Sequence, residues 1–189
     1  GTKEISKAYQ HTCSASMPSK ARCLREGIYN HTEEAEFSDA LAGRSIEELV
    51  HLPAMTDRTA IAAMEILAAG VHTAFVAAPQ LLLPIIYQGA ILSIQYGNSP
   101  RSPFFLCGIG AMLCAIVDAD PSDEATRAVI MSNKLQRVAL TLLGNPNNAC
   151  SKAKTLSGVG GHIQPWNEPI GNALDTVLQA YAAGLETGD

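Results

Sequence analysis

The glycine-rich run Gly158-Val159-Gly160-Gly161 is the first part of the sequence whose residues could do chemistry. Backbone N–H groups in glycine-rich loops can bind phosphate. A phosphate-binding P-loop also needs a preceding strand and a Gly-Lys-Ser/Thr ending, and both are missing around these glycines. We therefore interpret the run as a kinked helix that packs closely against a neighbour.

Histidine and acidic side chains offer the chemistry of a metal site. No two of the histidines have the i, i+4 spacing of a helical metal site: His11, His31, His51, His72 and His162. The densest acidic group is Asp118, Asp120, Asp123 and Glu124, and it lacks the spacing and the glycine of a calcium-binding loop. We interpret the acidic group as helix capping and the histidines as ordinary surface or core residues.

Cysteine and serine are the remaining candidates for nucleophilic catalysis. No serine lies in a Gly-x-Ser-x-Gly motif, and no cysteine has an identifiable His or Asn partner. The cysteines are odd in number and form no Cys-x-x-Cys pair, which disfavours a disulfide framework and a zinc site: Cys13, Cys23, Cys107, Cys114 and Cys150. On one helix, Cys107 and Cys114 would lie about 10 Å apart, too far for a disulfide. The sequence therefore predicts free thiols in a reducing cytoplasm and no catalytic, cofactor-binding or metal-binding residue.

Two helix-stop signals reveal the elements that the chain is built from. Tyr96-Gly97-Asn98-Ser99-Pro100 and Leu143-Gly144-Asn145-Pro146 lie 47 residues apart, and each closes an apolar run. Glycine tolerates the left-handed backbone just beyond a helix, and proline cannot continue a helix. Strand-like alternation is nowhere sustained. The sequence predicts an all-α fold of antiparallel helical hairpins stacked as a superhelix like that of tetratricopeptide repeats.

We expect one helical-repeat domain in four segments: N-terminal helices and a connector (1–56), then hairpins at 57–98, 99–145 and 146–189. Ser45 and Glu48 form a capping box that opens the connector helix. The second hairpin begins at Ser99-Pro100 or at Ser102-Pro103. Residues 165–169 form the turn of the third hairpin, where Trp166 either wedges two hairpins together or anchors a partner.

Composition and charge limit the classes of partner. A net charge of −5 without a Lys/Arg cluster argues against nucleic acid. The uncharged residues 66–100 are interrupted by prolines and glutamines, and the apolar run 104–117 is too short, so no membrane span is expected. The N-terminus leads into no apolar segment of a secretory signal, which favours a cytoplasmic location.

We expect part of the protein surface to be covered by another domain or by another protein chain. Hydrophobic residues make up 47% of the chain and charged residues only 16%, which is low for a freely soluble domain. The last hairpin has apolar residues on more than one face, so we expect an exposed patch that involves some of Leu174, Leu178, Tyr181 and Leu185. Such a patch would dock a neighbouring domain or allow a homo-oligomer.

Several short runs together carry a resemblance to a known family. They are Gly43-Arg44-Ser45-Ile46-Glu47-Glu48-Leu49, Leu52-Pro53-Ala54-Met55-Thr56-Asp57, Tyr96-Gly97-Asn98-Ser99-Pro100, Leu106-Cys107-Gly108, Ala153-Lys154-Thr155 and Gly184-Leu185-Glu186-Thr187-Gly188-Asp189. From about residue 25 onward the chain resembles the helical region of multidomain sensor kinases. In those proteins a serine/threonine-kinase-like domain and a STAND-type ATPase precede this region, and GAF and histidine-kinase modules follow it.

The resemblance implies a non-catalytic regulatory module that needs no cofactor. It would relay state between ATPase and sensor domains through protein–protein packing. The strict tetratricopeptide consensus is not met, and the hairpins are longer than 34 residues. The alternatives are a free-standing adaptor that binds a peptide or protein, and an enzyme with an unfamiliar active site.

Overall fold

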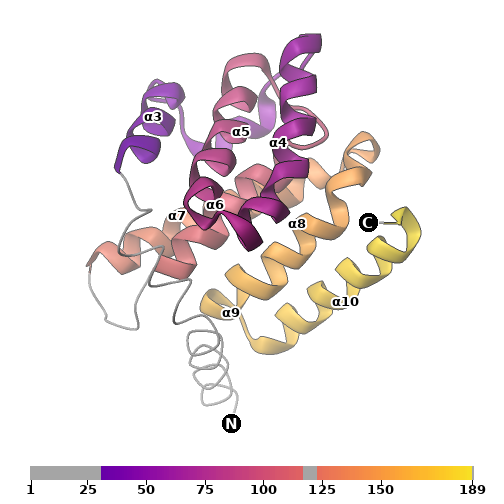
Figure 1. Ribbon diagram of the computed structural model, residues 1–189. Helices are drawn as coiled ribbons and strands as arrows, with labels where there is room; N and C mark the ends of the chain where they lie inside the picture. The colour runs from indigo at the N-terminus through magenta and orange to yellow at the C-terminus, as the bar shows by residue number, and fades with distance from the viewer. Residues whose placement is uncertain (1–30, 117–122, 189) are drawn as a thin grey trace.

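The computed structural model describes residues 31–116 and 123–188, and these residues form an all-α fold (Figure 1). Among them the structure has no strand, only an isolated bridge between Ala54 and Asn98. The elements are α3 (His31–Leu41), a 3₁₀ helix (Ile46–His51), α4 (Arg58–Ala77), a 3₁₀ turn (Pro79–Leu81), α5 (Leu82–Tyr96), α6 (Ser102–Ile116), α7 (Asp123–Leu143), a 3₁₀ helix (Pro146–Ser151), α8 (Lys152–Gly158), a π-helical turn (Val159–Ile163), α9 (Gln164–Asn167) and α10 (Ile170–Thr187). The expected helical class is confirmed.

Helix starts follow from capping side chains. The Asp57 carboxylate accepts a hydrogen bond of 2.7 Å from the Ala60 N–H, which satisfies one free donor in the first turn of α4. The Ser45 N–H donates to the Glu48 carboxylate over 3.3 Å at the start of the 3₁₀ helix Ile46–His51. The second hairpin begins at Ser102, where the hydroxyl accepts a 2.9 Å hydrogen bond from the Ser99 N–H.

The two helix-stop signals end their helices in different ways. Gly97 ends α5 with a φ of 98°, as its position in the first signal predicts. Its neighbour Asn98 donates its N–H to the Pro53 carbonyl over 2.7 Å, so the stop is also a tertiary contact with the segment before α4. Gly144 follows α7 but is not in the left-handed region, and its N–H donates to Thr141 in a tight turn. Of the two stop signals, the first alone has a glycine with positive φ, and Gly188 at the end of α10 is a further glycine of this kind, with φ 71°.

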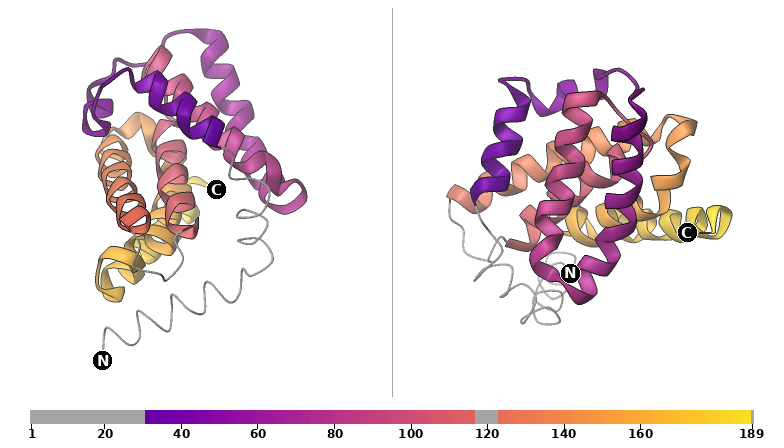
Figure 2. Two further views of the ribbon diagram at one scale, coloured as in Figure 1. Left: turned by 90° about the vertical axis from the view of Figure 1, so that its left-hand side faces the viewer. Right: turned by 45° about the horizontal axis from the view of Figure 1, so that its top comes forward.

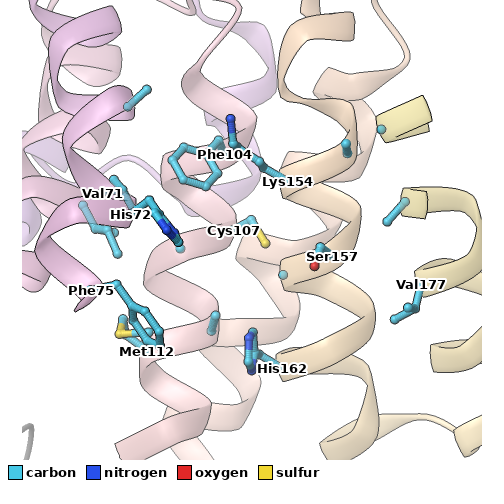
Figure 3. Close-up of a pocket in the computed structure, with 18 of the residues that line it drawn as sticks. Val71, His72, Phe75, Phe104, Cys107, Met112, Lys154, Ser157, His162 and Val177 are labelled. Atoms are coloured by element: carbon cyan, nitrogen blue, oxygen red, sulfur yellow. The ribbon is translucent and has the colours of Figure 1, made fainter. Parts of the chain in front are cut away.

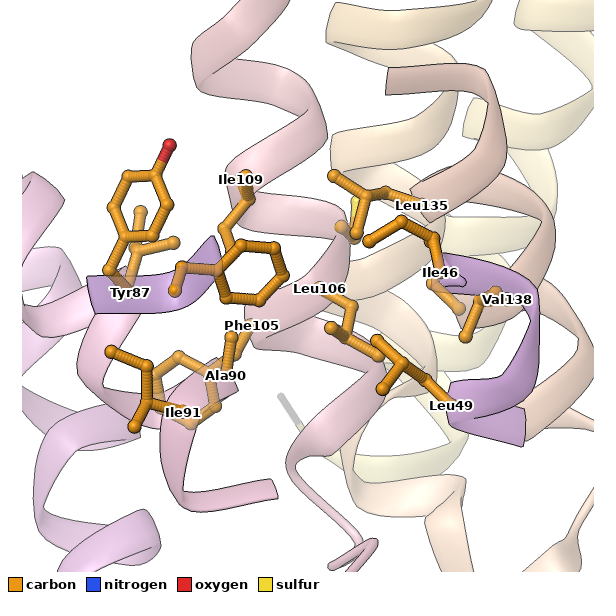
Figure 4. Close-up of a cluster of buried hydrophobic side chains, with 14 of the residues drawn as sticks. Ile46, Leu49, Tyr87, Ala90, Ile91, Phe105, Leu106, Ile109, Leu135 and Val138 are labelled. Carbon is orange, nitrogen blue, oxygen red and sulfur yellow. The ribbon is translucent and has the colours of Figure 1, made fainter. Parts of the chain in front are cut away.

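Helix α6 lies at the centre of the core, between α5 and α7 (Figure 4). Phe105, Leu106 and Ile109 of α6 are almost fully buried. The core residues around them come from α5, from α7 and from the 3₁₀ helix Ile46–His51: Tyr87, Ala90, Ile91, Leu135, Val138, Ile46 and Leu49. Because α6 is apolar on all sides, this central position buries most of its surface.

Helix α3 covers the outer side of α5. Phe37 and Tyr87 meet edge to face, with ring centroids 5.8 Å apart. Leu41, in the last turn of α3, also belongs to the buried cluster. Helix α3 is one of the N-terminal helices expected before residue 57, and it packs through the apolar positions of its otherwise acidic sequence.

The third hairpin corrects the expected turn. Residues 164–167 form the short helix α9, so the chain bends at Glu168 and Pro169 rather than over residues 165–169. The departure from regular α-helix lies earlier, in the π-helical turn Val159–Ile163. A side chain on Gly160 would come within 2.9 Å of the Ala173 carbonyl oxygen of α10. The glycine-rich run is helical and packs closely at Gly158 and Gly160, as interpreted from sequence, and it contains a π-helical turn.

Trp166 packs against the hydrophobic core of its own chain. It is half-buried against the hydrophobic core cluster, whose members come from several helices. This contact supports the wedge interpretation over the partner anchor. The neighbouring residue Glu168 connects two helices. Its carboxylate accepts a hydrogen bond of 3.1 Å from the Gln136 amide of α7 and one of 3.2 Å from the Gln164 amide of α9. Together they fasten the third hairpin to α7.

Candidate apolar binding groove

A cavity of about 860 Å³ lies between α4, α6, α8 and α10 (Figure 3). Its lining residues come from every one of these helices, from α5 and from the π-helical turn. They are Ala68, Val71, His72, Phe75, Leu82, Ile86, Phe104, Cys107, Gly108, Ala111, Met112, Ala153, Lys154, Ser157, Gly158, His162, Val177, Ala180, Tyr181, Gly184, Leu185 and Gly188. We call this cavity the groove.

Helical periodicity explains why the groove is a continuous apolar surface. On α4 the lining positions 68, 71, 72 and 75 lie on one helix face, and on α6 the same holds for 104, 107, 108, 111 and 112. The α6 wall therefore extends over about 12 Å, at 1.5 Å per residue. Small-molecule pockets are typically apolar cavities of about 300–1,000 Å³ with a few polar groups, and the groove fits this description.

The polar groups of the groove are His72, Lys154, Ser157 and His162. The described lining contains no Asp or Glu. His162 keeps exposed surface, and desolvation by the surrounding helices lowers the pKa of its imidazole. Lys154 is the one lysine or arginine of the described lining.

These polar residues were missed as a group by sequence reasoning. His72 and His162 line one groove although 90 residues separate them in the chain. No local spacing could have shown this, because the two residues come to one cavity only through the packing of α4 on α5, of α5 on α6 and of the π-helical turn on α6. The structure brings them to a cavity, and within the described residues no three His, Cys, Asp or Glu side chains gather as a metal site would require.

The other metal candidates lie elsewhere or outside the described residues. His11, Asp118 and Asp120 fall outside them. His31 and Asp123 begin α3 and α7, while His51 ends the 3₁₀ helix at the surface. Asp123 and Glu124 are the first two residues of α7, and the capping role of the acidic group stays a prediction.

The buried cysteines are free thiols with hydrogen-bond partners. Cys107 donates to the Thr155 carbonyl over 3.4 Å, and the Cys114 sulfur lies 3.1 Å from the Ser132 hydroxyl. Burial raises the pKa of Cys107 to about 12 and that of Cys114 to about 11. A thiol is a nucleophile only as a thiolate, so both are inert at neutral pH. Cys150 is free and exposed, and Cys13 and Cys23 lie outside the described residues.

These raised pKa values predict a loss of stability in alkali. Between pH 9 and about 11 the unfolded thiols ionise while the folded thiols keep their protons, so the free energy of unfolding falls as pH rises. We expect a loss on the order of 1 kcal/mol per thiol between pH 8 and pH 10, measured by urea unfolding. In a Cys107→Ala, Cys114→Ala double variant this pH difference should shrink accordingly. An unchanged difference would contradict the assignment.

Helix α4 is long and apolar enough to cross a membrane by length and composition alone. It has 20 residues, and only 17% of its most apolar window is buried. The uncharged run 66–100 does not coincide with this helix, because α4 begins earlier and includes Arg58 and Glu65. The Glu65 carboxylate pairs with Arg101 at 2.8 Å, which fastens α4 to the start of α6. One such helix is weak evidence for a membrane span, since core helices pass the same test.

Helix α10 presents two apolar faces of different kinds. Its small residues Ala173, Ala180 and Ala183 are buried. Its large apolar residues form an exposed stripe at spacings of four, three and four residues: Leu174, Leu178, Tyr181 and Leu185 are 59%, 56%, 67% and 70% exposed. The expected patch on the last hairpin is confirmed. We call these four residues the α10 stripe.

Comparisons with known proteins identify no relative. No protein-family profile matches the chain, and no curated protein or solved structure is similar to it. The resemblance to sensor kinases therefore stays a prediction from the sequence.

Proposed function

We propose that the chain is a non-catalytic helical docking module of a multidomain sensor kinase. It would relay state between the ATPase and sensor domains by packing against them. The observation that carries this proposal is the α10 stripe, because four large apolar side chains at 4-3-4 spacing form one continuous helix face that a partner can cover. Burying each of them further would contribute about 1 kcal/mol or more to docking.

The same proposal includes a superhelix like that of tetratricopeptide repeats. Three helix pairs support it, since α4 packs on α5, α6 on α7 and α8 on α10. The contacts between pairs run through α5 and α6 and through α6 and α8. Figure 2 shows that α10 lies at one end of this arrangement and α4 near the other. A terminal helix with an uncovered apolar face is typical of repeats that continue into a neighbouring unit.

The coding sequence on both sides of this chain tests the proposal. We expect a Walker motif upstream and a GAF or histidine-kinase domain downstream. In-frame stop codons on both sides of the coding sequence would contradict the sensor-kinase context and favour the free-standing adaptor. The groove is the observation that favours the adaptor, because it offers a binding site within this chain alone.

A non-catalytic module predicts that the purified chain hydrolyses no ATP and transfers no phosphate. The physical reason is that the described residues include no phosphate loop and no gathered metal ligands. The measurement is release of phosphate from ATP with Mg²⁺, compared with a buffer blank. Turnover that co-purifies with the chain through successive columns would contradict the proposal.

A further inference from the structure

One side of α4 is apolar and exposed, and it lies outside the groove. Ile66 and Val76 of α4 are 73% and 60% exposed, and Leu81 in the 3₁₀ turn after α4 is 50% exposed. We propose that this side of α4 and the following turn insert into the surface of a zwitterionic lipid bilayer, as a peripheral anchor that does not span the membrane. This lipid contact is separate from the docking face on α10.

Helical geometry places the exposed residues of α4 on one side of the helix. Four of them recur at spacings of three, four and three residues: Ile66, Ala69, Thr73 and Val76. From Ile66 to the end of α4 at Ala77 this side is about 17 Å long, at 1.5 Å per residue. The hydrocarbon of one leaflet is about 15 Å deep. An oblique α4 can therefore place its last turns among the acyl chains without crossing the bilayer.

The burial of α4 differs from that of a core helix. A core helix can be as apolar as a membrane helix because its apolar residues are buried. In α4 only 17% of the most apolar window is buried. In α6, by contrast, Phe105, Leu106 and Ile109 are almost fully buried. The apolar character of α4 therefore has no sufficient cause in the core of its own chain.

The absence of charge favours a lipid partner over a protein partner. Asp, Glu, Lys and Arg make up 16% of the chain, yet residues 66–100 contain none of them. The α10 stripe is bordered by the exposed residues Asp175 and Glu186, which match the polar rim of a protein interface. In α4 no charged residue follows Glu65. Charged side chains are costly in hydrocarbon, so an apolar face without them suits the interior of a bilayer.

The turn between α4 and α5 brings few free polar groups to a bilayer. The N–H groups of Ala78 and Leu81 donate within the turn, to Ala74 over 3.0 Å and to Ala78 over 2.9 Å. Pro79 has no N–H, and Gln80 is the polar side chain of the 3₁₀ turn. Internal hydrogen bonds lower the cost of inserting a backbone into hydrocarbon. In the left view of Figure 2 this turn projects beyond the neighbouring helices.

Charge also selects the class of lipid. The chain has a net charge of −5, and residues 66–100 offer no lysine or arginine to an anionic headgroup. Glu33 and Glu34, in the first turn of α3, lie near Tyr87 of α5 and add negative charge beside the hairpin. Anionic lipids attract basic segments, which this surface lacks. A zwitterionic surface is therefore expected, with binding that depends on apolar burial and little on salt.

The test is co-flotation of the purified chain with phosphatidylcholine vesicles, pure or mixed with phosphatidylglycerol, at low and at high salt. We expect binding to pure phosphatidylcholine that neither falls with salt nor rises with phosphatidylglycerol. Val76→Gln with Leu81→Gln should lower the partition coefficient about tenfold, because less apolar surface enters the bilayer. Leu174→Gln with Leu178→Gln is the matched control on α10, because it removes two apolar side chains of similar exposure, and it should leave binding unchanged.

Fluorescence reports the insertion directly. Trp166 is the only tryptophan of the chain and packs against its core, so it serves as the internal reference. A Leu81→Trp protein should show an additional emission that lipids brominated on their acyl chains quench. The additional emission of a Leu178→Trp protein, with its reporter on α10, should not be quenched.

Several results would overturn the proposal. They are no binding to phosphatidylcholine, binding that needs phosphatidylglycerol and falls with salt, and an equal loss of binding in the two double variants. A lipid-free association that Val76→Gln with Leu81→Gln abolishes would also overturn it, because a second copy of the chain would then cover this side of α4.

Discussion

A Gly97→Ala protein is expected to lose about 3 kcal/mol or more of its free energy of unfolding. Two costs add at this position. Gly97 has φ 98° and ψ 174°, a backbone region that essentially only glycine adopts. A Cβ atom there would also lie 2.3 Å from the Pro53 carbonyl oxygen, which is backbone and already accepts the Asn98 N–H. Urea unfolding followed by circular dichroism measures the loss.

Two other glycines separate these costs. Gly43 has φ 81° but no atom within 4 Å of the Cβ position, so Gly43→Ala should show the backbone strain alone, about 1 kcal/mol. Gly171 lies in the first turn of α10 with neither strain nor a close neighbour, so Gly171→Ala should be neutral or slightly stabilising. If Gly97→Ala and Gly43→Ala cost the same, the contact with Pro53 is not the cause.

Local signals in the sequence predicted the helices because each signal acts on its own neighbours. Asp57 caps α4 through a donor three residues away, and Gly97 ends α5 through its own backbone. Such effects depend little on the rest of the fold. The stop at Gly144 shows the limit of this reasoning, since the same residue types there end a helix through an ordinary tight turn. The residue types at Gly144 predict where α7 ends, but they do not predict the backbone conformation of that end.

The groove could not be predicted from the sequence for a related reason. His72 is 82 residues from Lys154 and 90 from His162, and it lines the same cavity only because α4 packs on α5, and α5 and α8 both pack on α6. The turn of the third hairpin was misplaced because Pro165 and Trp166 suggested a break. Proline is tolerated in the first turn of a helix, and α9 begins one residue before Pro165.

The α10 stripe was predictable because one helix contains the whole pattern. Ala173, Ala180 and Ala183 are small enough for α8 to approach closely, and Gly160 on the facing segment approaches Ala173. The large residues of α10 then remain on the other side of the helix. A face that packs through alanine and a face that exposes leucine follow from the same 3.6-residue period. The sequence thus determines the exposed face once the alanine face is buried.

This stripe leads us to expect that the purified chain associates with itself as its concentration rises. Pairing of two stripes would remove leucine and tyrosine surface from water, giving dimers at concentrations on the order of 100 µM. Leu174→Gln with Leu178→Gln should weaken association at least tenfold, because each loses about 1 kcal/mol of apolar burial. Both leucines are more than half exposed, so the free energy of unfolding should change by less than about 0.5 kcal/mol each. Light scattering over a concentration series measures the mass.

Ile130→Gln is the matched control for this association. Ile130 is 52% exposed on α7, so its substitution removes a comparable apolar side chain away from α10. Association that falls equally in the Ile130 variant would mean that general surface hydrophobicity, and not the stripe, drives it. A chain that stays monomeric throughout the series would contradict self-pairing. In that case the large residues of α10 remain uncovered in the isolated chain, and the docking proposal then requires that a different protein surface covers them.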